Sequence, residues 1–434
     1  MERHSGQATS GGKRSALAVL SVVCAGFLVA ASLTVTAAAK TTVTFATWGT
    51  EADWKPWVDM FKADNPDIDV KVVATDWATY WQKIDVMLAG AMDVDVVRLG
   101  GQHLPTYARQ GVLADMGPYF RRDIKAADFF PGALAGCEYR GVLYAVPEHF
   151  SPTTGYFNVS MYENAGLESP YDLWKSGRWT WDNFVAGAKR LTQDVNGDGR
   201  PDRWGAYLNW MDDGVWQSLV VSNGGTIYDP DFTRSTLDQP KALAALSWLT
   251  GLATRERVES PDADADWDAW VHGNVGFTHG APSYMQGWKT FKFTYDMVPL
   301  PIPEGGKETA VNVLNLLAIT KTSRHPEAAW RFVSYILSAK VQDARIQKWQ
   351  ILSARRDTAV KTVTGKYLPV AHPEVLVRIA ETSFPMQATV GFIQISAAVS
   401  SGLNDVVQGK LPIDVAVKER IVPKVDQLLA QARS

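Results

Sequence analysis

Short apolar strands alternate with amphipathic helices from residue 41 onward, and this alternation most constrains the fold. Predicted strands cover residues 42–46, 68–73 and 94–99. Between the first two, Trp54, Trp57, Val58 and Phe61 recur at the spacing of one helix face, and further helices are predicted over 79–88 and 104–109. Strands that alternate with helices in this way predict a parallel, doubly wound α/β sheet.

A second α/β region is predicted after Pro147. Its strands are expected at residues 156–158, 204–208, 274–278, 295–300 and 316–320. Helices are expected at residues 181–191, 326–337 and from 413 to the C-terminus. A chain of 434 residues with this pattern is long enough for two or three domain-sized units.

Charge and motifs exclude several functions. The formal net charge is -3, so no global cationic field favours nucleic acid. The sequence contains no HExxH, no Walker loop, no Gly-x-Ser-x-Gly and no cysteine pair for a metal. These absences argue against common hydrolase and nucleotide-binding chemistries.

The N-terminal segment has the order of a secretory signal. Arg3, Lys13 and Arg14 precede an apolar run at 16–35, which ends in three alanines at 37–39. Cleavage near Ala39 is expected, and an uncleaved membrane anchor is the alternative because the run is long enough to cross a bilayer. Cleavage leaves Cys137 as the single cysteine, so the exported chain holds together without an internal disulfide.

An ordered series of short motifs spans almost all of the chain after residue 39. It includes Trp48-Gly49, 80–84, 107–113, Leu143 to Pro147, Tyr156-Phe157-Asn158, 179–184, His325 to Trp330 and a C-terminal helix containing Gly409. In this order the chain resembles family 1 of the extracellular solute-binding proteins of ABC importers, the group similar to maltose-binding protein. It departs from the family in lacking glycines at 312–315 and in having Val159 after Asn158.

The resemblance implies a two-lobed, hinged α/β fold of the periplasmic-binding-protein type, in which each lobe is a doubly wound sheet flanked by helices. We expect a first lobe at 40–150, a second at 151–300, a return to the first at 301–355, and second-lobe helices at 356–434. The chain is expected to cross between lobes near Phe150, Leu300 and Arg355. The implied function is capture of a carbohydrate, an oligosaccharide, between the lobes and its delivery to membrane permease subunits by a monomer without catalysis or a required cofactor.

Aromatic and polar residues at predicted strand ends are the candidate ligand contacts, because ligands of open α/β sheets bind there. Sugars have apolar faces and a rim of hydroxyls, which suit aromatic rings combined with polar side chains. The strand-end candidates are Trp48, Glu51, Gln102, His103, Asn209, Trp210, Asp212, His279, Tyr284 and Trp288. Tyr80 and Trp216 are further aromatic candidates, and Glu148 lies at the first expected crossing. Asn312 and Asn315 lie in the expected loop before the strand at 316–320, where members of the family carry glycines.

Two other functions remain open at this point. The same tryptophans and acids are suited to a cationic solute, held in an aromatic cage with countercharges. A secreted glycosidase needs two acids that flank a sugar bond, and Glu51 and Glu148 are nominal candidates. By contrast, Trp54, Trp57, Trp248 and Trp330 lie on predicted helix faces and are expected in the core.

The loop at 194–202 resembles a calcium-binding loop. Asp194, Asn196, Asp198 and Asp202 supply oxygen atoms at positions 1, 3, 5 and 9, and Gly199 stands at position 6. Position 12 is Gly205 instead of the bidentate Glu of an EF-hand. The alternatives are a weak structural calcium site and a turn stabilised by Asx hydrogen bonds.

Overall fold

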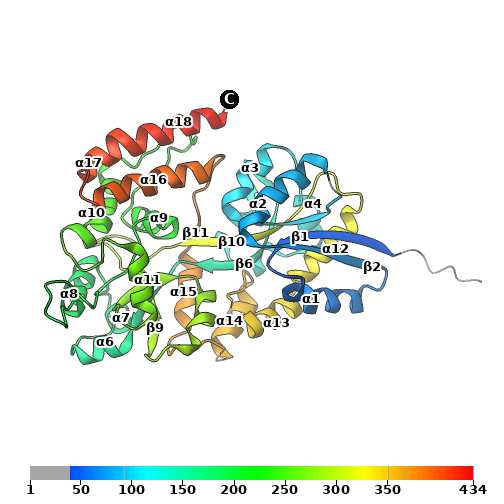
Figure 1. The fold of residues 1–434 in the computed structure, drawn as a ribbon. Helices are drawn as coiled ribbons and strands as arrows, with labels where there is room; N and C mark the ends of the chain where they lie inside the picture. The colour runs from blue at the N-terminus through cyan, green and yellow to red at the C-terminus, as the bar shows by residue number, and fades with distance from the viewer. Residues whose placement is uncertain (1–39, 92, 350, 366, 434) are drawn as a thin grey trace, which may run out of the picture. The chain divides into compact units, whose positions relative to one another are not determined.

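The computed structural model describes residues 40–91, 93–349, 351–365 and 367–433. These residues form one compact unit built around two β-sheets (Figure 1). The predicted signal segment and its cleavage site at 1–39 lie outside the described residues.

The larger sheet has the strand order β11-β10-β3-β1-β2, with β6 paired to β10. Its strands are β1 (Thr41–Trp48), β2 (Ile68–Thr75), β3 (Val96–Gly100), β6 (Val146–Pro152), β10 (Val311–Ile319) and β11 (Phe384–Pro385). β1 is parallel to β2 and to β3, as their alternation with helices predicts, whereas β10 is antiparallel to β3 and to β6.

Local sequence signals explain the first helices on this sheet. α1 (Glu51–Asp64) begins at a capping box formed by Thr50 and Asp53, and it buries the predicted face of Trp54, Trp57, Val58 and Phe61. α2 (Trp77–Val86) begins after Asp76, whose side chain accepts from Thr79 N–H. α3 (Leu104–Arg109) has the predicted bounds. α12 (Pro326–Ile336) contacts both α1 and β1.

The smaller sheet is antiparallel, with the order β8-β7-β9. Its strands are β7 (Thr154–Asn158), β8 (Phe277–Gly280) and β9 (Tyr295–Val298). The expected strand at 204–208 is reduced to isolated parallel bridges, in which Trp204 pairs with Val275 and Tyr207 pairs with Thr278. The two-lobed α/β fold class is confirmed, but the expectation of a doubly wound sheet in each lobe is wrong for the smaller sheet, because β7 pairs antiparallel with both β8 and β9.

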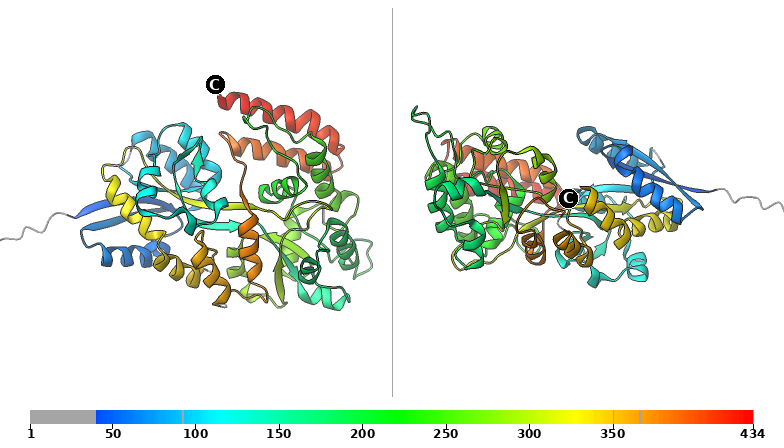
Figure 2. Two further views of the ribbon diagram at one scale, coloured as in Figure 1. Left: turned by 180° about the vertical axis from the view of Figure 1, so that it is seen from behind. Right: turned by 90° about the horizontal axis from the view of Figure 1, so that it is seen from below.

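Two hydrophobic cores accompany the sheets. The first core lies under the larger sheet and also takes in aromatic residues of the smaller one. The second core contains the buried faces of five helices. These are α8 (Trp181–Leu191), α9 (Asp213–Ser222), α10 (Pro240–Thr254), α16 (Phe392–Val407) and α18 (Val422–Arg433). In Figure 1 and the left view of Figure 2, α16 and α18 lie side by side, and they are in contact.

The remaining described elements are short. The helices are α4 (Gly117–Asp123), α5 (Pro131–Ala135), α6 (Val159–Asn164), α7 (Pro170–Lys175), α11 (Ala263–Val271), α13 (Ala339–Trp349), α14 (Arg356–Thr364), α15 (Glu374–Thr382) and α17 (Ile413–Val415). A hairpin pairs β4 (Glu138–Tyr139) with β5 (Val142–Leu143).

The chain passes between the two sheets three times. β6 continues directly into β7 through Thr153, and β9 leads back to β10 through residues 299–310. The third passage runs from β11 to α16 through residues 386–391. It lies well beyond Arg355, because α15 packs against α5 and β6 of the larger sheet. Residues 356–434, expected together in the second lobe, are therefore split between the lobes. α15 packs on the larger sheet, and α16 and α18 pack in the second core.

Candidate functional site

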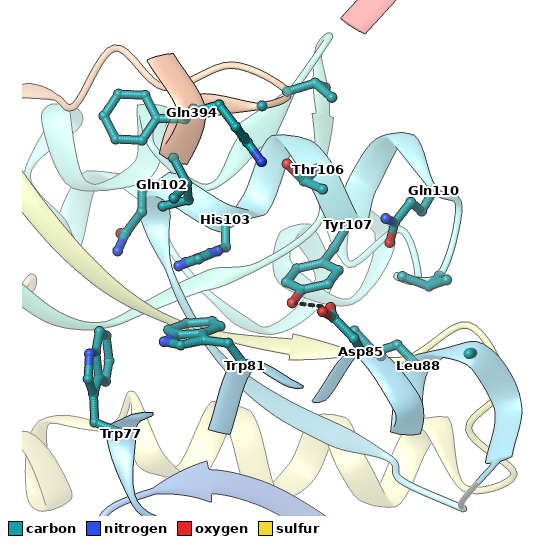
Figure 3. Close-up of a pocket in the computed structure, with 16 residues that line it drawn as sticks. Trp77, Trp81, Asp85, Leu88, Gln102, His103, Thr106, Tyr107, Gln110 and Gln394 are labelled. Atoms are coloured by element: carbon teal, nitrogen blue, oxygen red, sulfur yellow. Dashed lines mark hydrogen bonds between the residues drawn. The ribbon is translucent and has the colours of Figure 1, made fainter. Parts of the chain in front are cut away.

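A large cavity, here called the aromatic cavity, opens between α2, α3 and the start of α16 (Figure 3). Its volume is about 970 Å³. Sixteen residues line it, and they include Trp77, Trp81, Asp85, Gln102, His103, Thr106, Tyr107, Gln110, Phe392, Ile393 and Gln394. Aromatic rings from the first lobe thus share one cavity with amide groups from both lobes.

The phase of α2 decides which of its aromatic side chains reach the cavity. Trp77, Trp81 and Asp85 stand four residues apart, so they share one helix face, and all three line the cavity. Tyr80 points into the core instead and is buried, with its hydroxyl donating to Arg98 O at 2.6 Å. Tyr80 was a predicted contact and Trp77 and Trp81 were not, although their spacing of four is a readable signal.

A stack of rings forms one wall of the aromatic cavity. The His103 ring lies 3.7 Å from the Trp81 ring with an interplanar angle of 18°, and Tyr107 stacks beyond His103 at 6.4 Å. The Tyr107 hydroxyl donates to Asp85 Oδ1 at 2.8 Å, as Figure 3 shows. Burial lowers the pKa of His103 to about 4, against a smaller opposing effect of Asp85. His103 is therefore neutral at pH 7.

Trp48 extends this wall from the end of β1. Its ring meets Trp77 at 5.0 Å and Trp81 at 5.8 Å between centroids. The guanidinium carbon of Arg98 lies 4.0 Å from the Trp48 centroid, within the range of a cation–π contact. Trp48 itself is half-buried, whereas the neighbouring Trp77 ring is exposed.

A second, smaller cavity of about 190 Å³ lies where the two sheets meet, and we call it the polar cavity. Its polar lining residues are His149, Ser151, Thr153, Asp212, His279, Ser283, Tyr284 and Asn315. They come from β6 and β10 of the larger sheet and from the segments around α9 and β8. Four of the expected residues, Asp212, His279, Tyr284 and Asn315, therefore meet here.

Two histidines in the polar cavity have fixed partners. Asn315 Nδ2 lies 3.1 Å from His149 Nδ1, and burial, with a smaller effect of Arg98, lowers the pKa of His149 to about 3. A neutral His149 that accepts at Nδ1 carries its proton on Nε2, which has no hydrogen-bond partner among the described residues. His279 Nε2 lies 3.5 Å from Asp212 Oδ2. Burial alone would lower the pKa of His279, but Asp212 raises it overall.

The two cavities are neighbours across β3 and β10. Asn315, in the polar cavity, pairs with Gly100, and Gln102 and His103 of the aromatic cavity follow immediately. Among the described residues that line the two cavities, none is Lys or Arg. The combined site offers exposed rings, amides, hydroxyls and two carboxylates.

Several expected contacts are removed from this site by burial. Trp210, Trp216, Trp288 and Asn312 are each at most 3% exposed and line neither cavity. Trp210 and Trp216 belong to the second core, Trp288 to the first, and Asn312 donates to Ser383 Oγ at 3.2 Å. The physical reason is that a Trp side chain covered by a helix or sheet packs in the apolar core.

Three more candidates take structural positions. Glu148 is fully buried, with Oε2 accepting from Arg98 Nε at 3.1 Å and Oε1 in contact with Arg345 Nη2. Glu51 is the exposed first residue of α1 and lines neither cavity. Asn209 adopts a positive φ of 48° and its side-chain oxygen accepts from Met211 N–H, which shapes the turn before α9.

The loop at 194–202 is exposed, and its side-chain oxygens accept backbone hydrogen bonds. Asp194 accepts from Gly197 and Gly199 N–H, and Asp202 accepts from Val195 and Asn196 N–H, at 2.7–3.0 Å. Asn196 and Asp198 each accept from the N–H two residues later. Among the described residues, no group of three or more His, Cys, Asp or Glu side chains is arranged to hold a metal ion.

Calcium binding by this loop stays a prediction. If calcium binds, Asp194, Asn196, Asp198 and Asp202 have to turn from these N–H groups to the ion. The ion is expected to affect the stability of the protein more than its affinity for the solute. The measurement is a thermal melt with chelator and after calcium is restored. Identical melting temperatures, with no heat of calcium binding, would leave only the Asx turn.

The family model for bacterial extracellular solute-binding proteins matches residues 40–343. The chain belongs to this family. Curated relatives from Brucella abortus and Brucella suis, designated only as binding proteins, are 22% identical over 285 residues. The match covers 64% of this chain and 66% of each relative, slightly less than two thirds of their length.

Solved structures share the fold at low identity. The sugar-binding protein MalE of Xanthomonas citri has a TM-score of 0.80 at 22% identity, covering 91% of this chain and 98% of that one. An ABC substrate-binding protein of Listeria monocytogenes in complex with cycloalternan has a TM-score of 0.77 at 23% identity, covering 90% and 99%. A cyclic α-maltosyl-1,6-maltose binding protein of Arthrobacter globiformis also reaches 0.77, at 16% identity, covering 90% and 100%.

Proposed function

We propose that this protein is the solute-binding component of an ABC importer and that it binds a carbohydrate, an oligosaccharide, between its two lobes. The observation that carries the proposal is the aromatic cavity, in which Trp77 and Trp81 face the amides of Gln102 and Gln394. Exposed rings match the apolar faces of sugars, and amides match their hydroxyl rims. Ligands in the names of the similar structures support a sugar.

Closure of the lobes is the mechanism that this arrangement supports. Trp77, Trp81 and His103 belong to the first lobe, whereas residues 391–394 open α16 in the second core. The left-handed Gly391, at φ 80°, precedes α16 and points its first turn toward the cavity. A sugar that first contacts the rings and then gains contacts to Gln394 stabilises the closed state through its differential affinity.

A thermal-shift screen tests the solute class. Oligosaccharides, polyols, polyamines and betaines are compared at equal concentration, and a ligand of the folded state raises the melting temperature by mass action. Carbohydrates are expected to give the shifts. Stabilisation by betaines or polyamines alone would contradict the sugar assignment and favour the cationic-solute alternative.

Trp81→Ala is expected to weaken oligosaccharide binding by about 1–3 kcal/mol, because it removes the central ring of the wall. Trp48→Ala is expected to act in the same direction through Trp77 and Trp81. The matched control on the same helix is Val86→Ala, which is 56% exposed and lines neither cavity. Isothermal titration calorimetry measures the affinities, and equal losses for Trp81→Ala and Val86→Ala would contradict the site.

We further infer that the protein performs no chemistry on the solute. Both oxygens of Glu148 contact arginines inside the core, so the pair of Glu51 and Glu148 is not available as two acids flanking a sugar bond. Product analysis after long incubation with the bound oligosaccharide tests this. Cleavage products that disappear on replacing Glu51 or Glu148 would establish the glycosidase instead.

Export and a membrane partner complete the proposal. The family description is extracellular, and residues 1–39 have the composition of a cleaved signal. Among the described residues, no helix is long and apolar enough to cross a membrane. The expected N-terminus of the exported protein is Lys40, to be read by N-terminal sequencing. Recovery of residues 1–39 on membrane-bound protein would support the anchor.

A further inference from the structure

One carboxylate dominates the electrostatics of the aromatic cavity. Asp85 is exposed on α2, and none of the other fifteen lining residues is Asp, Glu, Lys or Arg. His103 is the remaining ionisable neighbour that could carry a positive charge, and burial keeps it neutral at pH 7. The cavity therefore presents one negative charge without a cation in its lining.

The hydrogen bonding of Asp85 leaves this charge uncompensated. Its one hydrogen bond from the described residues comes from the Tyr107 hydroxyl, a neutral donor, at 2.8 Å. Lys83, on the same helix, donates instead to Thr75 Oγ1 at 3.0 Å. A carboxylate beside aromatic rings, without a protein cation, is suited to a ligand that brings its own positive charge.

Two nearby arginines are held within the protein. Arg98 and Arg345 share the buried Glu148, and the exposed Asp53 also attracts Arg98. Both arginines lie behind the cavity wall and line neither cavity. One ring of this aromatic group already binds a cation, because the Arg98 guanidinium lies 4.0 Å over Trp48 in a cation–π contact.

We propose that the solute carries a protonated amine, which binds the carboxylate of Asp85 beside the ring of Trp81. Trp81 and Asp85 are one helical turn apart on the same face of α2, so a single ammonium group can meet both. This inference rests on the proposed function, which supplies the sugar. Together they identify the solute as a basic amino sugar. Uronic acids and sugar phosphates are disfavoured, because their charge is repelled by Asp85 and Asp212.

Matched sugars that differ only in the amine test the proposal. The β-1,4-linked trimers of glucosamine, N-acetylglucosamine and glucose are titrated by calorimetry, and glucosamine and glucose are compared by ligand-detected NMR, which is independent of linkage. The basic sugar is expected to bind about tenfold more tightly than its neutral counterpart, and this preference is expected to fall as salt rises.

Asp85→Asn is expected to abolish this preference, so that the variant binds the basic and the neutral sugar with similar affinity. Glu51→Gln, which removes an exposed carboxylate that lines neither cavity, is the matched control and should keep the preference. Asp85 is exposed, so its replacement is not expected to affect folding, and the salt dependence of the wild type provides a second readout.

The outcomes distinguish the amine proposal from the sugar-binding function. Equal or tighter binding of the neutral sugar by the wild type, or an amine preference that survives Asp85→Asn, would overturn the amine proposal and leave the sugar-binding function standing. Absence of binding for every sugar in these titrations and in the thermal-shift screen would overturn both.

Discussion

Glu148→Ala is expected to lower the free energy of unfolding by about 3–5 kcal/mol, the range for breaking a buried ion pair from one side. The substitution leaves the fully buried Arg345 and the nearly buried Arg98 without their shared carboxylate. The alternative charge, Asp53, lies in the exposed cap of α1 and does not replace it. Equilibrium urea unfolding measures the effect.

The control for this prediction is an exposed ion pair. Glu327→Ala removes the partner of Arg122 at the surface, where the side chains are 62% and 50% exposed, and is expected to change stability by at most about 1 kcal/mol. A cost for Glu148→Ala no larger than that of Glu327→Ala would contradict the account of Glu148 as a structural residue. Glu148→Gln, which keeps the shape and removes the charge, should remain strongly destabilising.

Trp210→Ala is expected to destabilise the protein by about 3–5 kcal/mol, because it empties a fully buried site in the second core. The sequence-based expectation was instead that Trp210 contacts the solute. The Trp210 Nε1–H has no hydrogen-bond partner among the described residues, so packing is what holds this ring.

Two comparisons separate packing from ligand contact. Trp210→Phe keeps a ring and removes the unpaired N–H, and it should cost less than the alanine variant. Trp77→Ala removes an indole that is 51% exposed and should cost less than about 1 kcal/mol of stability, but it should weaken solute binding. A stable Trp210→Ala protein with impaired binding would return Trp210 to the site.

Local sequence predicts several helices in both lobes. The predicted helices at 104–109 and 181–191 match α3 and α8, and the latter starts where Thr180 accepts from Asn183 N–H. Caps and hydrophobic periodicity act over four or fewer residues, so they are readable without the tertiary structure. The ordered motifs were sufficient for the family, and the family sets the fold class.

The residues predicted from strand ends lie only in part at the two cavities. Trp48, Gln102, His103, Asp212, His279, Tyr284 and Asn315 lie in or beside the two cavities. Tyr80 and Trp216 lie elsewhere, because the phase of each helix points their side chains into a hydrophobic core. An ideal helix repeats every 3.6 residues, so an error of one position exchanges a cavity ring for a buried one.

Contacts between residues far apart in the chain could not be predicted from local sequence. Glu148 contacts Arg345, 197 residues away, and Asn315 contacts His149, 166 residues away. Phe392 and Gln394 reach the aromatic cavity only because the chain returns to the second core after β11. Neighbouring residues were enough to predict the helices named above, most strands of the larger sheet and the family. Side-chain burial and charge pairing were decided by packing between segments that are far apart in the chain.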